Sequence, residues 1–385
     1  MEKKKSLLIF ILALGAFSII NTELGVMGIL PMIAEFYDIS IAQAGAMVSV
    51  FALVVAASAP TMPLVLSRLN RKYLLMGVLA IFALGNILSA LVASFEFALA
   101  VRVVQAIFHP VFLSMAFSLA AASVEVKEAP KAVSKVFIGI STALIIGVPM
   151  TTLLASNFGL MTARFYAAGL NILALLAVAK YIPIIKVSAP RSIGSQISVL
   201  KDKIVWLSMI AVVFLNGSII GVYSYFSEFL EKVTQLSWNT ISLFLLIFGT
   251  MGILGNMIAG KLLSSQPKKL VVMVPIIVFI TFLAITLFGS VGLVVGLLTV
   301  ILGIVGGING VINQYWVSTS APTAPEFANG LFISSANIGT TLGTTFAGII
   351  ISGIGIQYMA FTGVVFAIAS LVFILLRFKL NPSTV

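Results

Sequence analysis

The stretch LLIFILALGAFSIINTELGVMGILP, residues 7–31, decides the fold class of this chain. It is long enough to cross a bilayer, because a spanning helix needs about 20 apolar residues. Its only charged residue is Glu23. An ionisable side chain inside a bilayer is costly, and it usually faces a bundle interior or an aqueous cavity. The stretch therefore predicts a membrane helix whose carboxylate lies on the path of an ion or a solute.

The composition extends this prediction to the whole chain. Hydrophobic residues make up 61% of it and charged residues only 9%, whereas soluble domains carry about 25% charged residues. At roughly 30 residues per helix and loop, the 385 residues accommodate about twelve spans and leave little for a soluble domain. Cysteine is absent and there is one histidine, which excludes disulfides and thiolate metal sites, and no metal site is expected.

The hydrophobic segments predict an all-α polytopic membrane protein with twelve transmembrane helices in two six-helix, pseudo-symmetric halves. The longest polar break, residues 183–203, lies near the middle of the chain. We therefore expect an N-terminal six-helix bundle at 1–182, a cytoplasmic linker at 183–203 and a C-terminal six-helix bundle at 204–385. The predicted spans are 6–30, 41–66, 73–93, 97–122, 132–156, 164–182, 204–229, 240–262, 269–289, 292–317, 327–351 and 357–377.

The distribution of basic residues predicts the orientation of these spans. A net charge of +11 is also typical of nucleic-acid-binding proteins. Here, however, nineteen of the 22 Lys and Arg residues fall in the segments on the same side as the N-terminus. Such a bias marks cytoplasmic loops. It predicts cytoplasmic termini, a lipid bilayer as partner and no nucleic acid. The start, MEKKKSLLIF, is followed by an apolar run too long for a signal peptide, so we expect a retained first helix.

Two motifs mark the first and fourth helices, namely NTELGVMGILP at residues 21–31 and VRVVQAIFHPVF at residues 101–112. Together with the twelve spans, they resemble the major facilitator superfamily. More narrowly, they resemble its twelve-helix drug:proton antiporter group, which includes arabinose-efflux-type permeases. The resemblance covers essentially the whole chain. It implies two homologous halves that move around a central cavity, where the solute binds near the midplane.

The resemblance implies that Glu23 takes part in proton coupling and that Arg102 is tied to proton transfer. Arg102, Gln105 and His109 share one helical face, because they are spaced at i, i+3 and i+7. The resemblance implies that the first and fourth helices meet, and an unpaired arginine in a span is expensive, so we expect Arg102 to pair with Glu23. The pair either separates and joins with solute or conformation, or it is a permanent structural ion pair. His109 either relays protons or is a hydrogen-bonded residue at a helix kink, and Glu23 has the alternative role of a polar tie between helices.

The loop from Pro63 to Lys72 is similar to the basic signature that the superfamily carries between its second and third helices. Arg68, Arg71 and Lys72 match it. Ser67 replaces an aspartate that helps to close the inner face, and Asn70 replaces a glycine, which predicts a left-handed turn. The resemblance implies a gating loop, weakened by the serine. The alternative is that these bases only set the topology.

The fifth helix contains GISTALIIGVPMTT, residues 139–152. Gly139, Gly147 and Pro149 match a motif that the family associates with export. Small residues allow helices to approach closely, and a proline in a span bends it. Close packing of two helices is the purely structural interpretation, and it is compatible with the export role.

We expect polar and aromatic side chains in the spans to line the solute cavity. Each of them has an alternative role as a hydrogen-bond partner of a neighbouring helix. The second half has no clear intramembrane acid, and the low number of fixed charges favours neutral or cationic amphipathic solutes. The predicted cavity residues are Asn21, Gln105, Tyr223, Phe226, Asn309, Asn313 and Asn337.

These predictions combine into a proton-coupled efflux transporter of the bacterial plasma membrane, which we expect to act as a monomer. No cofactor is expected, since the proton gradient supplies the energy and no nucleotide-binding motif is present. The protein is not expected to be an enzyme. The alternatives are an exporter of sugars or nucleosides, an uncoupled facilitator, and a membrane sensor or scaffold that no longer transports.

Overall fold

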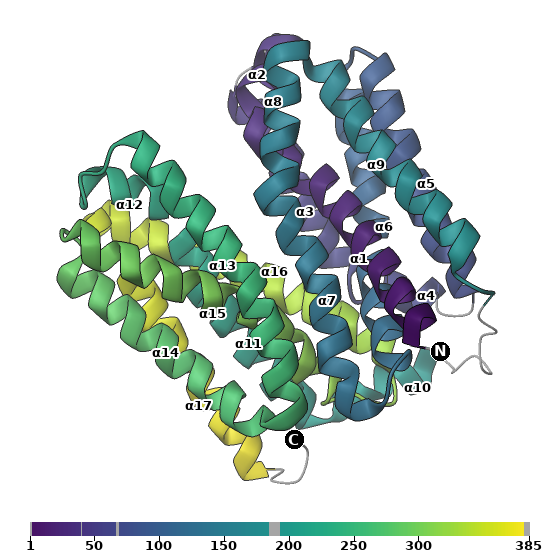
Figure 1. The fold of residues 1–385 in the computed structure, drawn as a ribbon. Coiled ribbons are helices and arrows are strands. Elements are labelled where there is room, and N and C mark those ends of the chain that lie inside the picture. The colour runs from purple at the N-terminus through teal and green to yellow at the C-terminus, as the bar shows by residue number, and fades with distance from the viewer. Residues whose placement is uncertain (1, 40, 67–68, 185–192, 381–385) are drawn as a thin grey trace. The chain divides into compact units, whose positions relative to one another are not determined.

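The computed structural model describes residues 2–39, 41–66, 69–184 and 193–380, and within these ranges every regular element is a helix. The chain divides into two compact units, Met1–Gln196 and Ile197–Val385. The boundary falls inside the predicted linker, residues 183–203. Each unit is a bundle of helices (Figure 1), and the predicted all-α fold is confirmed.

The first unit begins with a long helix that changes its winding near the end. After Leu24 it continues as a 3₁₀-helix, Gly25–Ile29. A second irregularity is the π-helical turn Ala143–Gly147, which joins α7 to α8. The helices of this part of the chain are α1 Glu2–Leu24, α2 Leu30–Tyr37, α3 Ile41–Ser58, α4 Met62–Val65, α5 Arg71–Leu91, α6 Phe95–Ala122, α7 Ala129–Thr142, α8 Val148–Phe158, α9 Leu160–Tyr181 and α10 Ile193–Ile197.

The second unit is built from six long helices and one short one. Serine hydroxyls and aspartate carboxylates begin several helices of the chain, as Asp202 does for α11 by accepting a hydrogen bond from the Ile204 amide at 2.8 Å. The helices are α11 Lys203–Tyr223, α12 Phe226–Lys232, α13 Trp238–Ser265, α14 Pro267–Phe288, α15 Gly292–Ser318, α16 Pro325–Ile354 and α17 Ala360–Leu380.

Eleven helical stretches in the described ranges are long and apolar enough to cross a membrane. The second predicted span, residues 41–66, is different. Its long apolar helix ends at Ser58, and the short α4 follows after a turn. Thr61, at this break, bonds to the Ser58 carbonyl at 3.2 Å, and Pro63 lies in the first turn of α4. Proline cannot donate a backbone hydrogen bond, so the segment is interrupted there.

Glycine contacts give each unit a closely packed pair of helices. In the first unit, a Cβ at Gly139 of α7 would overlap the Ala13 carbonyl of α1. In the second unit, Gly217 of α11 and Gly339 of α16 leave no room for a Cβ, since one at Gly217 would lie 2.6 Å from the Gly339 carbonyl. These pairs correspond to predicted spans one and five and spans seven and eleven. The equivalent contacts support two structurally related halves.

Candidate functional site

Glu23 of α1 and His109 of α6 meet inside the first unit. Glu23 Oε2 lies 3.0 Å from His109 Nε2, where the histidine side chain is 4% exposed and the glutamate side chain 21% exposed. Neither ring nitrogen makes an aligned hydrogen bond. The imidazole and the Phe51 ring of α3 pack in a T-shaped arrangement, with the centroids 5.7 Å apart. The structure thus places the only histidine of the chain against the carboxylate that the sequence singles out.

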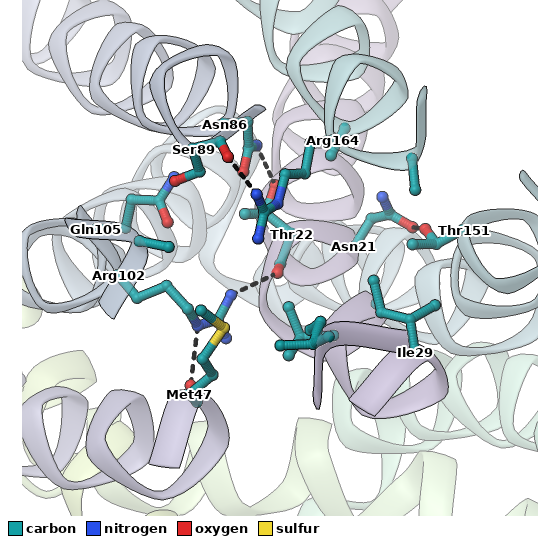
Figure 2. Close-up of a pocket in the computed structure, with 16 residues that line it drawn as sticks. Asn21, Thr22, Ile29, Met47, Asn86, Ser89, Arg102, Gln105, Thr151 and Arg164 are labelled. Atoms are coloured by element: carbon teal, nitrogen blue, oxygen red, sulfur yellow. Dashed lines mark hydrogen bonds between the residues drawn. The ribbon is translucent and has the colours of Figure 1, made fainter. Parts of the chain in front are cut away.

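Arg102 binds backbone rather than the Glu23 carboxylate. Its Nη2 donates to the carbonyl of Glu23 at 3.1 Å and its Nη1 to the carbonyl of Thr22 at 3.2 Å. Its Nε donates to the Met47 carbonyl of α3 at 2.8 Å, as Figure 2 shows for Thr22 and Met47. The predicted ion pair between the Arg102 guanidinium and the Glu23 carboxylate is therefore wrong, because the guanidinium binds the backbone carbonyl of Glu23.

The physical reason is the end of α1. The last carbonyls of an α-helix lack partners within the helix, and α1 gives way to a 3₁₀-helix directly after Leu24. The Arg102 guanidinium satisfies two of these carbonyls, and it also lies over the Phe51 ring, 4.7 Å from its centroid. The arginine holds α1, α3 and α6 together at this level and leaves the Glu23 carboxylate to His109.

The position of His109 depends on the proline that follows it. Pro110 lies inside α6 and cannot donate to the carbonyl four residues earlier. That carbonyl, on Ala106, accepts a hydrogen bond from the Ser58 hydroxyl at 3.3 Å. Gln105, predicted for the solute cavity, donates instead to the Phe82 carbonyl of α5 at 3.1 Å. Helix α6 is therefore fixed to α3 and α5 about one turn before the histidine.

Thr22 is the centre of a polar network that joins three helices. Its hydroxyl donates to the Ser18 carbonyl at 3.2 Å and accepts from Asn86 Nδ2 and Asn171 Nδ2, both at 3.0 Å. The three residues come from α1, α5 and α9. Arg164 of α9 lies nearby, and it donates to the Ser89 carbonyl of α5 (Figure 2). No sequence motif marks Asn86, Ser89, Arg164 or Asn171, because their roles depend on which helices meet.

The export-associated motif packs directly on α1. A Cβ on Gly147 would overlap Asn21 Oδ1, and the Thr151 hydroxyl donates to the same oxygen at 3.3 Å. The amide nitrogen Nδ2 of Asn21 is buried and has no partner. The π-helical turn at 143–147 comes just before Pro149. Such turns are frequent at functional sites, so the motif provides both a close approach and a local irregularity.

A small polar cavity of about 50 Å³ lies among these side chains. It is lined from α1, the 3₁₀-helix Gly25–Ile29, α2, α3, α5, α6, α8 and α9, by apolar as well as polar residues, and the lining includes two guanidinium groups but no carboxylate (Figure 2). Its polar lining residues are Asn21, Thr22, Asn86, Ser89, Arg102, Gln105, Thr151 and Arg164.

A larger hollow of about 460 Å³ runs along α1 and α7. Its lining is mostly apolar and aromatic, including Phe10 and Phe17, with Ser6, Thr142 and a single cation, Lys135. Ligand pockets of about 300–1,000 Å³ take drug-sized molecules. The hollow is therefore large enough for an organic solute, whereas the polar cavity is not.

The predicted gating loop is described only in part, since Ser67 and Arg68 lie outside the described residues. Asn70 has φ −62° and caps α5 by accepting a hydrogen bond from the Lys72 amide at 3.0 Å. The predicted left-handed turn at Asn70 is wrong, because a capping side chain needs an extended backbone. Lys72 Nζ donates to the Ala179 carbonyl in the last turn of α9 at 2.7 Å. Arg71 begins α5.

In the second unit, three asparagines form a chain of amide hydrogen bonds. Asn313 Nδ2 donates to Asn309 Oδ1 at 2.8 Å, and Asn309 Nδ2 donates to Asn216 Oδ1 at 2.9 Å. Asn216 Nδ2 in turn donates to the Ala336 carbonyl at 2.8 Å. Asn337 Nδ2 donates to the Ile333 carbonyl of its own helix at 2.9 Å. Asn309, Asn313 and Asn337 are among the residues predicted to contact the solute. In this conformation they form hydrogen bonds with other protein atoms.

The two aromatic candidates differ in their exposure. Tyr223 is half-buried and stacks on Phe248 with centroids 4.2 Å apart. Phe226 is 1% exposed and lies parallel to Phe229. The described residues contain no group of three or more histidine, aspartate or glutamate side chains that could hold a metal ion. The roles of all predicted cavity residues as solute contacts stay predictions.

Comparisons with known proteins agree with the helical architecture. The chain is 30% identical over 358 residues to the MFS-type transporter YtbD of Bacillus subtilis, with 91% of this chain and 90% of that protein covered. It is 29% identical to the inner membrane transport protein YdhP of Escherichia coli, with 97% of this chain and 96% of that protein covered. A probable sugar efflux transporter of Helicobacter pylori is 26% identical, with 96% of each chain covered.

Solved structures share the fold at low sequence identity. The human organic anion transporter MFSD10 superposes with a TM-score of 0.79 at 13% identity, covering 96% of this chain and 99% of that one. The fucose:proton symporter FucP of Escherichia coli superposes with a TM-score of 0.78 at 14% identity, covering 95% of this chain and 97% of that one. The Major Facilitator Superfamily model matches residues 7–326. The chain therefore belongs to the major facilitator superfamily and is a multi-pass membrane transporter.

Proposed function

We propose that this transporter exports small, neutral or cationic amphipathic solutes in exchange for protons, by alternating access. The observation that carries the proposal is the Glu23–His109 pair, with 3.0 Å between Oε2 and Nε2 inside a membrane-spanning bundle. A carboxylate and an imidazole at this distance can share or exchange a proton. Buried ionisable residues in spans are typical of proton pathways.

In this mechanism Glu23 binds and releases the transported proton. His109 Nε2 lies where it can accept that proton or stabilise the carboxylate after its release. Arg102 keeps the end of α1 in position through the carbonyls of Thr22 and Glu23. A ligand shifts a conformational equilibrium only through different affinities for the two states, so proton and solute binding must each favour a different state.

The solute class rests on the hollow along α1 and α7. Its apolar and aromatic lining suits an amphipathic molecule, and Ser6 and Thr142 offer hydroxyl groups for orientation. Lys135 places one positive charge at this hollow, which favours the neutral members of the proposed class. The direction of export rests on the motif Gly139, Gly147 and Pro149. The working unit is a monomer in the bacterial plasma membrane, with both termini in the cytoplasm.

The proposal is tested in liposomes that contain the purified protein and a pH-sensitive dye. A proton gradient is imposed, and lipophilic cations, neutral antibiotics, sugars and nucleosides are added one at a time. Wild type is compared with Glu23→Gln and with Glu35→Gln, which removes an exposed acid of α2. We expect solute-evoked proton flux that Glu23→Gln lowers at least about 10-fold, as is usual for a lost proton-transfer group, and that Glu35→Gln leaves intact.

Two other results would contradict the proposal. Solute movement without proton flux, equal in wild type and Glu23→Gln, would make the protein an uncoupled facilitator. Thermal unfolding is used to check that the protein is folded. If folded protein moves no solute of the whole panel, a sensor or scaffold would be favoured.

A sugar exporter with the same coupling is the second candidate function. It is favoured by the similarity to the probable sugar efflux transporter of Helicobacter pylori, which is 26% identical over 96% of each chain. The same liposome panel separates the two candidates. Proton flux evoked by sugars but by none of the lipophilic compounds would replace the amphipathic solute class with sugars.

A further inference from the structure

We propose that the polar cavity of about 50 Å³ in the first unit is a binding site for a small monovalent anion of the size of chloride. The ion would lie among the guanidinium groups of Arg102 and Arg164 and the amide nitrogen of Asn21, which all line the cavity. The site is separate from the hollow along α1 and α7. It does not depend on the proposed direction of transport or on the solute.

Charge is the first argument. Two guanidinium groups line the cavity and no carboxylate does. The Glu23 carboxylate, whose Oε2 contacts His109, interacts electrostatically with Arg102 and offsets part of its charge. Arginine stays protonated in proteins, and two like charges beside one cavity repel each other. One carboxylate offsets at most one of the two positive charges, and an anion between the guanidinium groups would supply the second counter-charge.

Unused hydrogen-bond donors are the second argument. A guanidinium group has five N–H donors. Arg102 gives three of its bonds to carbonyls. Arg164 gives one to the Ser89 carbonyl and rests on the Tyr37 ring, 5.4 Å from its centroid. Both therefore have donors left over.

Asn21 provides the independent sign of a ligand. Its side chain is 1% exposed, and its Nδ2 has no hydrogen-bond partner. Buried polar groups almost always have one. The Oδ1 atom of the same amide accepts from Thr151, another lining residue, at 3.3 Å (Figure 2), which leaves Nδ2 as the donor without a partner at the cavity. An unpaired donor beside two cations fits an anion.

The size of the cavity limits the occupant. One water molecule needs about 10–15 Å³ of such space, so about 50 Å³ admits a chloride-sized ion with one or two waters. Organic solutes need about 300 Å³ or more. Water alone would fill the space and accept hydrogen bonds, but it would not supply the second counter-charge.

Thermal unfolding of the purified full-length protein tests the site. The midpoint Tm is measured in sodium chloride, bromide, nitrate and gluconate at equal ionic strength, so that general screening is constant. We expect chloride and bromide to raise Tm by at least about 2 °C in a saturable way and gluconate, which is too large for the cavity, to have no such effect. Anomalous scattering from bromide in a crystal should then place the ion beside Arg164.

Three variants make the test specific. Arg164→Gln removes one cation of the site, and we expect it to abolish the chloride effect. Asn21→Asp keeps the acceptor for Thr151 and supplies an anion covalently, so its Tm in gluconate should be at least that of wild type and should not respond to chloride. Lys232→Gln removes an exposed cation of α12 in the other unit and should respond like wild type.

The proposal fails if chloride and gluconate give the same Tm in wild type, since the cavity then holds water only. It also fails if Asn21→Asp keeps the chloride response, or if Lys232→Gln loses it. Should Arg164→Gln not fold, Asn21→Asp and the bromide position decide the question.

Discussion

Single polar atoms in the first unit serve several helices at once. The Thr22 hydroxyl oxygen accepts from Asn86 and Asn171 and donates to Ser18. In an apolar surrounding, a polar group without a partner is costly. Thr22 therefore acts as a joint between α1, α5 and α9, one residue away from the Glu23 carboxylate.

Replacing this joint should lower stability. In Thr22→Val the shape is kept, but Asn86 Nδ2 and Asn171 Nδ2 each lose their bond to Oγ1. Interhelical hydrogen bonds in membranes contribute about 0.6 kcal/mol on average and up to about 1.7 kcal/mol, so we expect a loss of about 1–3 kcal/mol, measured as a lower Tm. Thr250→Val is the control, because Thr250 is exposed and bonds only to the Leu246 carbonyl of its own helix. Equal Tm values for the two variants would contradict the role of Thr22.

Residues with a charge in an apolar run were the ones that the sequence could indicate. Glu23 and Arg102 stood out for this reason, and the structure places them side by side. Their partner atoms could not be predicted, since Arg102 binds a carbonyl that is free only where α1 changes its winding. Arg164 lies near the outer end of a predicted span, where a charged residue is common. The sequence therefore did not predict that Arg164 lines the polar cavity.

At the scale of helices, the irregular turns lie at the polar cluster. The 3₁₀-helix Gly25–Ile29 follows Glu23, the π-helical turn 143–147 faces Asn21, and Pro110 follows His109. Each irregularity frees or redirects backbone carbonyls, and side chains of neighbouring helices bind several of them. The first unit therefore combines its ionisable groups with its least regular backbone.

Close packing of α1 on α7 can be tested with glycine substitutions. In Gly139→Ala the new Cβ would overlap the Ala13 carbonyl, so backbone must shift, at a cost of about 1–3 kcal/mol. We expect a lower Tm and reduced solute-evoked proton flux. Gly77→Ala in α5 is the matched control, because a Cβ there meets nothing within 4 Å and alanine favours helix by about 0.5–1 kcal/mol. Unchanged Tm and flux in Gly139→Ala would refute close packing at this position.

The positions of the helices could be predicted from hydrophobicity, but their irregularities could not. Eleven of the predicted spans correspond to long apolar helices in the described ranges. The break between α3 and α4 coincides with Pro60 and Pro63, which a prediction based on the hydrophobicity of the whole segment did not use. The turns at Gly25–Ile29 and 143–147 depend on contacts with Arg102 and Asn21, which are tertiary and leave no periodic signal.

At the scale of the whole molecule, the two units share their packing but not their polar groups. Helix pairs with glycine contacts recur in both, as Gly139 and Gly217 show. Where the first unit has Glu23, His109 and Arg102, the second has a neutral chain of amides through Asn309. We infer that proton coupling belongs to the first unit, while the amide chain stabilises the second.

This division of roles predicts different defects for substitutions in the two units. Asn309→Leu keeps a similar size but leaves Asn216 Oδ1 and Asn313 Nδ2 without their bonds to residue 309. We expect a loss of stability of about 1–2 kcal/mol and slower transport. The ratio of protons to solute should stay at the wild-type value, because no proton-binding group is removed.

The ratio is measured by recording solute and proton fluxes together in the same liposomes, with Glu23→Gln beside it as the uncoupled reference. Because slower transport lowers both fluxes equally, the ratio distinguishes a loss of stability from a loss of coupling. A ratio in Asn309→Leu that falls toward that of Glu23→Gln would show that the second unit takes part in proton coupling. In that case the amide chain, and not only the Glu23–His109 pair, would have to change with the proton-binding state.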